Sequence, residues 1–265
     1  MNKPKKKINA FDVLVEKFAA EFIKIPDFDL LEKDNSGRRM FNILIFRLAD
    51  LSSYKDLVVN YYVPATNKAI IDSEQMMIQS KFKAFLTYKK EDLYDTLYQT
   101  IRLAYVGIFH KLESFMTDIL QMSQILYEDQ DHSETLEKFA KRKFDFQFRD
   151  WQQFYITGKI NWICNCVKHY DGFPLKEPKP AVFSYLPADK RLSISKDEFK
   201  TDVETLIEFT NVYLQLMFMI AHYKTLIELH DPELWKDDPD AQQQQEAAFN
   251  DVFQKIKNFI DVIKN

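Results

Sequence analysis

The feature that most constrains the fold is a long helical repeat of apolar residues near the middle of the chain. Apolar side chains recur every three or four residues at Leu93, Leu97, Ile101, Ala104, Ile108, Leu112, Phe115, Ile119 and Met122. This spacing places all of them on one face of an α-helix, because such a helix turns once in about 3.6 residues. The repeat predicts one long amphipathic helix over residues 91–127.

The scarcity of glycine argues against a strand-rich fold. Only 4 of the 265 residues are glycine, far below the average of about 7%, and tight turns between strands depend on glycine. Phenylalanine is frequent, with 23 residues beside 13 tyrosines and 3 tryptophans, so we expect a core built largely from aromatic rings. Together these features predict an all-α fold, a helical bundle.

Further helices are expected on both sides of the repeat. Pro26 and Pro64 are expected to end two of them, because proline has no backbone N–H to donate within a helix. The proline-rich residues 173–186 are expected to form a loop, and Ser195 and Glu198 have the spacing of a capping box before the next helix. The expected helices span residues 8–23, 38–62, 65–88, 91–127, 133–144 with Ser133 as cap, 149–170, 195–229 and a last amphipathic segment from Phe249 to Ile263.

Charge and composition exclude several classes of function. The net charge is −4, so no overall excess of positive charge indicates a binder of nucleic acid or of a membrane surface. The lysines near the N-terminus are expected to form a solvated tail. The most apolar run, residues 212–221, is about half of the roughly 20 residues that span a bilayer, so no membrane association is expected.

Cofactor and metal chemistry also find little support. The four isolated glycines form no phosphate-binding loop, and the five histidines and two cysteines lack metal-ligand spacing, so we expect neither a cofactor nor a metal. Cys164 and Cys166 are one residue apart on an expected helix, which is poor geometry for a disulfide. Free cysteines favour a cytoplasmic location.

One segment, residues 161–172 with the sequence NWICNCVKHYDG, combines residues that occur together in a known signature. Asn165 and His169 are one helical turn apart, and Asp171-Gly172 follows. The segment resembles the motif of the HEPN superfamily, in which a helix carries Arg, usually then Asn, with a His about a turn further on. The segments 112–115 (LESF) and 191–195 (RLSIS) resemble that family's flanking segments.

The resemblance covers residues 91–223 and implies an RNA-directed helical domain that pairs through the helices carrying the motif. It implies a site in which His169 transfers protons, with Asn165 and Glu113 beside it. On this basis we expect a helical extension over 1–88, a HEPN-like bundle over 89–231 and an amphipathic C-terminal helix over 232–265.

The sequence departs from the family where the motif has arginine, because Cys164 stands there. The resemblance implies that in active HEPN ribonucleases this arginine stabilises charge on the phosphate. Removal of one such donor lowers the rate by roughly 10²–10³. Cysteine cannot replace it, so activity would require another cation. Lys168, Arg102 and Lys159 are the candidates for that role and for binding RNA.

Three hypotheses for the function therefore stay open. The first is a degenerate HEPN-like domain that serves as a binding or regulatory subunit in a prokaryotic antiviral defence or toxin–antitoxin system, as a homodimer or with another protein partner. The second is an active, metal-independent endoribonuclease that uses His169. The third is a helical scaffold whose HEPN resemblance is coincidental, since a lone histidine on a helix face is commonly a core or interface residue.

Overall fold

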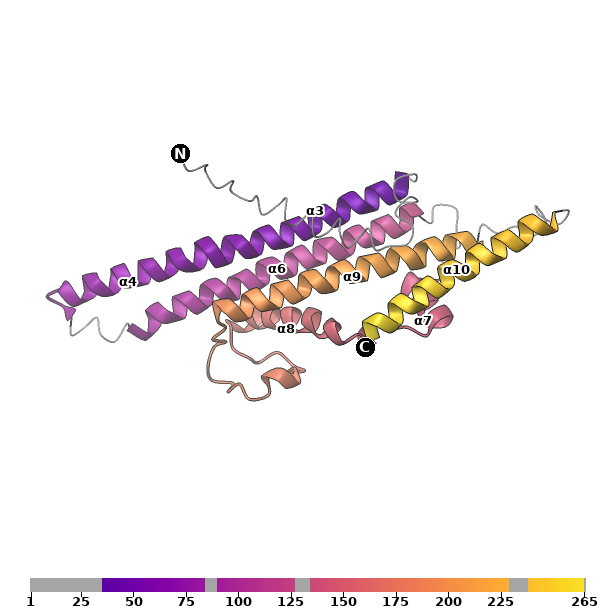
Figure 1. Cartoon of the computed structure of the whole chain (residues 1–265). Helices are drawn as coiled ribbons and strands as arrows, with labels where there is room; N and C mark the ends of the chain where they lie inside the picture. Colours follow the sequence, from indigo (N-terminus) through magenta and orange to yellow (C-terminus); the bar gives the residue numbers. More distant parts are fainter. Residues whose placement is uncertain (1–34, 84–89, 127–133, 229–237, 265) are drawn as a thin grey trace, which may run out of the picture. The chain divides into compact units, whose positions relative to one another are not determined.

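The computed structural model describes residues 35–83, 90–126, 134–228 and 238–264. Within these ranges the chain is all-α and contains no strand, which confirms the expected fold class. Figure 1 shows the seven α-helices of the described residues. They are α3 (Asn35–Leu57), α4 (Val63–Gln79), α6 (Lys90–Leu126), α7 (Leu136–Phe144), α8 (Tyr155–Tyr170), α9 (Lys196–Glu228) and α10 (Pro239–Lys264).

The chain divides into two compact units, each built from segments far apart in the sequence. Unit 1 comprises Met1–Ala49, Met116–Gln152 and Phe209–Asn265, and unit 2 comprises Asp50–Phe115 and Gln153–Glu208. The expected three-part division at residues 88 and 231 follows breaks in the sequence, and it stays a prediction.

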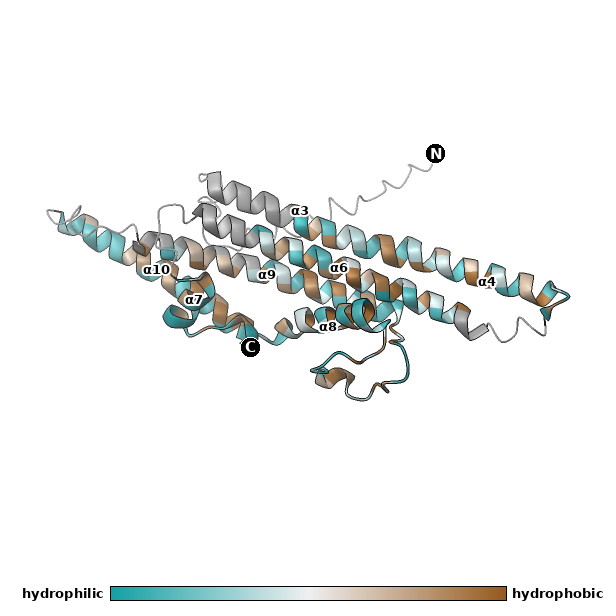
Figure 2. Cartoon of the chain, turned by 180° about the vertical axis from the view of Figure 1, so that it is seen from behind, coloured by the Kyte–Doolittle hydropathy of each residue, from teal (hydrophilic) through white to brown (hydrophobic). Residues whose placement is uncertain are grey.

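Unit 2 contains α4, α8, the larger part of α6 and the first part of α9. In it α8 lies beside α6 and α9 (Figure 1), and apolar residues recur along these three helices between polar ones (Figure 2). The buried side chains Ile101, Ile108, Ile160 and Leu206 belong to its core. Unit 2 also holds the segment that resembles the HEPN motif.

Unit 1 has a core of aromatic rings contributed by α7, α9 and α10. The rings of Phe144 and Phe253 stack with centroids 5.1 Å apart, and Tyr223 packs 5.5 Å from Phe144. A second group joins Trp151 to Phe209, whose ring centroids are 4.8 Å apart. These contacts agree with the aromatic core expected from the composition.

The helices expected from the long apolar repeat and from the capping box are confirmed as α6 and α9. At the start of α9 the Ser195 hydroxyl accepts a hydrogen bond from the Glu198 backbone N–H at 3.0 Å, the first of the two bonds of a capping box, while the Glu198 carboxylate accepts from Lys159. The last amphipathic helix is α10, which begins at Pro239, and Asp238 caps it by accepting from the Ala241 N–H at 3.0 Å. The helix expected over residues 8–23 lies outside the described residues.

The expected helix break at Pro64 is wrong. A π-helical turn, Val58–Tyr62, joins α3 to α4, and Pro64 lies in the first turn of α4. The Val63 N–H bonds the Val58 carbonyl, a π-type bond across five residues. The backbone before Pro64 is already helical, with Tyr62 at φ −67° and ψ −50°, so Pro64 removes one N–H donor from a continuous helical run without ending it.

Two other helices begin later than expected. The helix expected from residue 149 begins at Tyr155, because Phe148–Asp150 and Gln152–Phe154 form two 3-10 turns separated by Trp151 in an extended conformation. The helix expected from Ser133 begins at Leu136 with Thr135 as its cap, and Ser133 itself lies outside the described residues. Of the described helices, none is long and apolar enough to span a bilayer.

Candidate functional site

Helix α8 carries the motif residues and ends in a left-handed cap. Asp171 has φ 51° and Gly172 has φ 81°, and the N–H groups of both donate to the Cys166 carbonyl. A side chain at Gly172 would be strained by the positive φ and would meet Arg102, whose Cδ lies 2.9 Å from the position of a Cβ. Glycine at this position therefore lets α6 approach the end of α8.

One face of α8 is buried, and it includes Cys164, which stands where the HEPN motif that the segment resembles has arginine. Cys164 and Cys166 are both fully buried, and Trp162 is 5% exposed. Burial raises the pKa of the Cys164 thiol, the Lys168 charge opposes this effect and the Glu113 charge adds to it. Cys164 is therefore a core residue that lies within electrostatic reach of Glu113 and Lys168.

The remaining surface of α8 is exposed and polar, and it begins at Lys168, one turn from Cys164. Lys168 and His169 are exposed on it, and Asn165 is half-buried. Asn165 donates to the Asn161 carbonyl at 2.8 Å and to the Asn161 side-chain oxygen at 2.6 Å, so its amide is used within its own helix. Among the described residues, His169 has no hydrogen-bond or ion-pair partner.

Glu113, the acid expected to hold His169, pairs with a different histidine. Its carboxylate lies 3.2 Å from Nδ1 of His110, one turn away on α6, and both side chains are more than half exposed. Contacts between such exposed partners contribute little free energy, so this pair leaves Glu113 accessible to solvent.

Lys159, expected to contact RNA, is buried among carboxylates. Its ammonium group lies 2.7 Å from Asp202 and 3.1 Å from Glu198, and the Tyr105 hydroxyl donates to Asp202 at 2.6 Å. Burial alone would lower the pKa of Lys159, but the hydrogen bond and charge of Asp202, with the charge of Glu198, raise it. Burial and the neighbouring Asp202 also raise the pKa of Tyr105. Lys159 is therefore held as a cation inside unit 2.

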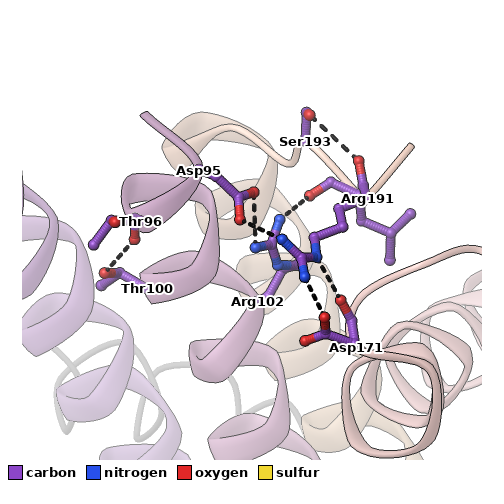
Figure 3. Close-up of polar contacts among 8 residues, drawn as sticks. Asp95, Thr96, Thr100, Arg102, Asp171, Arg191 and Ser193 are labelled. Atoms are coloured by element: carbon purple, nitrogen blue, oxygen red, sulfur yellow. Dashed lines mark hydrogen bonds and ion pairs between the residues drawn. The ribbon is translucent and has the colours of Figure 1, made fainter. Parts of the chain in front are cut away.

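Arg102, another expected RNA contact, is also buried. Its guanidinium donates to the Leu192 carbonyl at 2.9 Å and to Asp95 at 2.9 Å (Figure 3). Arg191 shares Asp95 at 3.1 Å and also bonds the carbonyl and carboxylate of Asp171. Lys159 and Arg102 could contact a ligand only after leaving these partners, which leaves Lys168 as the exposed cation among the three candidates.

These networks also contain Asp95, Asp202 and Tyr105, which were not among the expected site residues. Asp95 precedes Arg102 by seven residues, two helical turns, so their proximity on α6 could have been inferred. Asp202 and Tyr105 gave no comparable signal, because Lys159 meets them only through the packing of α6, α8 and α9. Among the described residues no group of His, Cys, Asp and Glu is arranged to hold a metal ion.

Comparison with family models, with curated proteins and with solved structures finds no match to this chain.

Proposed function

We propose that this chain is a degenerate HEPN-like domain that binds a protein partner and does not cut RNA. The observation that supports this proposal is the burial of Cys164 in the position of the motif arginine, on the side of α8 away from the exposed His169. A donor at that position would point into the core, so it could not stabilise charge on a phosphate beside His169.

The exposed face of α8 is the surface we assign to the partner. Asn161, Lys168 and His169 provide hydrogen-bonding groups along it, and Tyr155 adds a ring that is more than half exposed. At Gly158 an added Cβ would meet nothing within 4 Å, so the helix backbone is open to close approach there. A setting in defence or toxin–antitoxin systems, and pairing with a second copy, follow from the resemblance alone.

The endoribonuclease hypothesis is the second candidate. The exposure of His169 beside Lys168 favours it, because a general base must reach its substrate and a cation must lie close by. It requires a second cation to replace the motif arginine, and Arg102 and Lys159 are both engaged with carboxylates.

Incubation of the purified chain with labelled RNA, beside His169→Ala, separates the two candidates. We expect no cleavage by either protein. Cleavage by the wild type that disappears in His169→Ala would establish the endoribonuclease and overturn the proposal.

A second experiment tests the assigned face. Gly158→Arg places a long side chain on the open part of α8, and Gln152→Arg is the control, since Gln152 is exposed and precedes α8. We expect Gly158→Arg to abolish the association detected by sedimentation of the wild type, alone or with a co-purifying protein, and the control to retain it. Equal association by both variants would favour the scaffold hypothesis.

A further inference from the structure

The two ends of the loop between α8 and α9 lie next to each other. The Leu192 N–H donates to the Gly172 carbonyl at 2.8 Å, and Arg191 bonds Asp171 across the same junction. Arg102 of α6 donates to the Leu192 carbonyl at this junction, and Asp95 of α6 accepts from Arg191 (Figure 3). Residues 173–190 therefore form a closed loop with a charged stem.

The far part of the loop is attached to α8 by one stacked pair of aromatic rings and by the polar contacts that adjoin it. The Phe183 ring stacks on Trp162, with centroids 4.8 Å apart and planes 20° apart, and the Lys159 ammonium lies 5.5 Å from the same ring. The Trp162 indole N–H donates to the Lys176 carbonyl at 2.7 Å. The loop thereby covers the edge of α8 that carries Trp162 and Cys166.

The turn that carries Phe183 has two distinct rows of side chains. Exposure defines the two rows: Phe183 is buried and Leu186 is half-buried, so they form the inner row, whereas Val182 and Tyr185 are exposed and form the outer row. Phe183 is 3% exposed, whereas Tyr185 is 75% exposed. The inner row holds the loop on α8, and the outer row has no part in the attachment.

Few other contacts hold the loop: Pro174 is buried, the N–H groups of Leu175 and Lys176 bond to Cys166, and the Lys179 ammonium donates to the Leu186 carbonyl at 3.1 Å within the loop. Between residues 173 and 190, its backbone-to-backbone hydrogen bonds join residues at most three apart. The stem pair of Arg191 and Asp171 is largely exposed, and exposed ion pairs contribute little. Segments held by few buried contacts open at lower free energy than the whole domain unfolds.

We propose that residues 173–190 are a detachable strap that regulates the binding face of α8. When it is closed, the accessible face of α8 is the polar one that contains Asn161 and His169. When it opens, Trp162 and Cys166 at the neighbouring edge become accessible and add an apolar region to that face. This inference rests on the proposed function only for its biological role, because the opening itself can be measured without a partner.

The thiol of Cys166 reports the opening directly. It is fully buried in the closed state, and the N–H groups of Lys176 and Leu175 in the loop bond to it. The chain has only 2 cysteines, so Cys164→Ala leaves Cys166 as the single thiol. The rate of its reaction with the disulfide reagent DTNB, measured in increasing urea, then measures the population of the open strap.

A matched pair of substitutions separates the two rows of the turn. Phe183→Ala removes the inner ring, and we expect it to accelerate labelling of Cys166 by about tenfold or more, since a buried ring stabilises the closed state substantially. Tyr185→Ala removes an outer ring from the same loop, and we expect an unchanged rate. Circular dichroism checks that both variants keep the helical content of the wild type.

A second pair tests the stem with a smaller perturbation. Arg191→Gln removes the partner of Asp171 and Asp95, whereas Lys190→Gln removes one charge from an adjacent exposed residue without a described ion-pair partner. We expect Arg191→Gln to raise the labelling rate of Cys166 a few-fold at low salt. The increase should be smaller at high salt, because salt screens the stem pair in the wild type. We expect no change in the rate for Lys190→Gln.

The strap proposal would be overturned if the labelling rate of Cys166 had the same urea dependence as global unfolding. It would also be overturned if Phe183→Ala and Tyr185→Ala accelerated this labelling equally. Either result would leave the proposed partner face untouched, since that face is exposed in the closed state. Conversely, loss of the proposed function in the RNA and sedimentation experiments would leave the measured opening in place.

Discussion

The two units achieve stability with different interactions in their cores. Unit 1 packs aromatic rings against each other, with Phe144 between Phe253 and Tyr223. Unit 2 encloses an ammonium group, a carboxylate and a phenol in the contact of Lys159, Asp202 and Tyr105. Aromatic packing depends on shape and area, whereas a buried ion pair depends on the presence of every partner.

This difference teaches where each unit is vulnerable. Removal of one group from an aromatic cluster leaves a cavity that its neighbours fill in part. Removal of one group from a buried ionic network leaves a charge without its counterpart in a poorly solvated place. The network of Lys159, Asp202 and Tyr105 in unit 2 is therefore expected to be more sensitive to the loss of one group than the aromatic cluster around Phe144 in unit 1.

The largest effect is expected for Asp202→Ala. It leaves Lys159 and Tyr105 without their shared partner, at a cost of about 3–5 kcal/mol, measured by guanidinium unfolding. The triple variant Tyr105→Phe, Lys159→Met, Asp202→Leu replaces the network with apolar groups of similar size and is expected to recover most of this loss. A triple variant as unstable as Asp202→Ala would show that packing and not charge dominates this site.

Phe144→Leu tests the aromatic side of the comparison. The substitution keeps an apolar side chain in a buried position, so we expect a loss of about 1 kcal/mol in the free energy of unfolding. The loss should be the same at pH 5 and pH 8, because ring packing involves no group that titrates between them. A loss that differs between these two pH values would contradict the contrast between the units.

The alkaline stability of unit 2 sharpens the comparison further. Because the folded pKa of Lys159 lies above the ordinary value of 10.5, its stabilising contribution is fully present below pH 10.5 and is lost as pH rises through the raised pKa. The raised pKa of Tyr105 acts in the same direction above pH 10.0. The wild type should therefore lose stability with rising pH more steeply than the triple variant, in unfolding experiments from pH 9 upward. Burial also raises the pKa values of Tyr213 in unit 1 and Tyr54 in unit 2, and both residues are present in both proteins. Parallel pH dependences would therefore mean that the network of Lys159, Asp202 and Tyr105 contributes nothing to this loss.

The smallest effect is expected for Arg142→Gln in unit 1. Arg142 bonds both carboxylate oxygens of Glu134, at 2.9 and 2.7 Å, in an exposed position. The hydrogen bond from Arg142 lowers the pKa of Glu134. The stabilising contribution of the pair is therefore fully present above the ordinary pKa of glutamate and is lost as pH falls through the lowered pKa. Exposed pairs contribute about 0.2–1 kcal/mol. The difference in the free energy of unfolding between wild type and Arg142→Gln should shrink as the salt concentration rises. A loss of stability as large as that of Asp202→Ala would contradict the distinction between exposed and buried pairs.

The helices that sequence periodicity predicted best are those whose apolar spacing continues without interruption. In α6 the apolar spacing agrees with the helix, and in α9 the cap at Ser195 agrees as well, because local preference and burial act in the same direction. At Trp151 local helical preference and burial conflict. Its ring stacks on Phe209 while its backbone is extended, and α8 begins only after this residue. No local pattern encodes that contact, because Phe209 lies far along the chain.

The candidate site was predictable in its residues but not in their environments. The sequence placed Asn165 and His169 one turn apart, and the structure has them on one helix. It gave no means to learn that Cys164 lies in the core or that Lys159 and Arg102 are enclosed by carboxylates, since burial of a basic residue depends on partners supplied by other helices. Their roles at the site stay predictions.

The π turn before Pro64 has a consequence for the register of the chain. The buried residues along this part are Leu51, Val58, Val63 and Ile70. Their positions advance by seven, then five, then seven residues, so one step departs from the spacing of the other two. The π turn acts as a skip residue, of the kind left when one amino acid is inserted into a helix without loss of its buried face. An alignment that treats residues 51–70 as an uninterrupted helical repeat would therefore assign inward and outward positions incorrectly on one side of Val58–Tyr62.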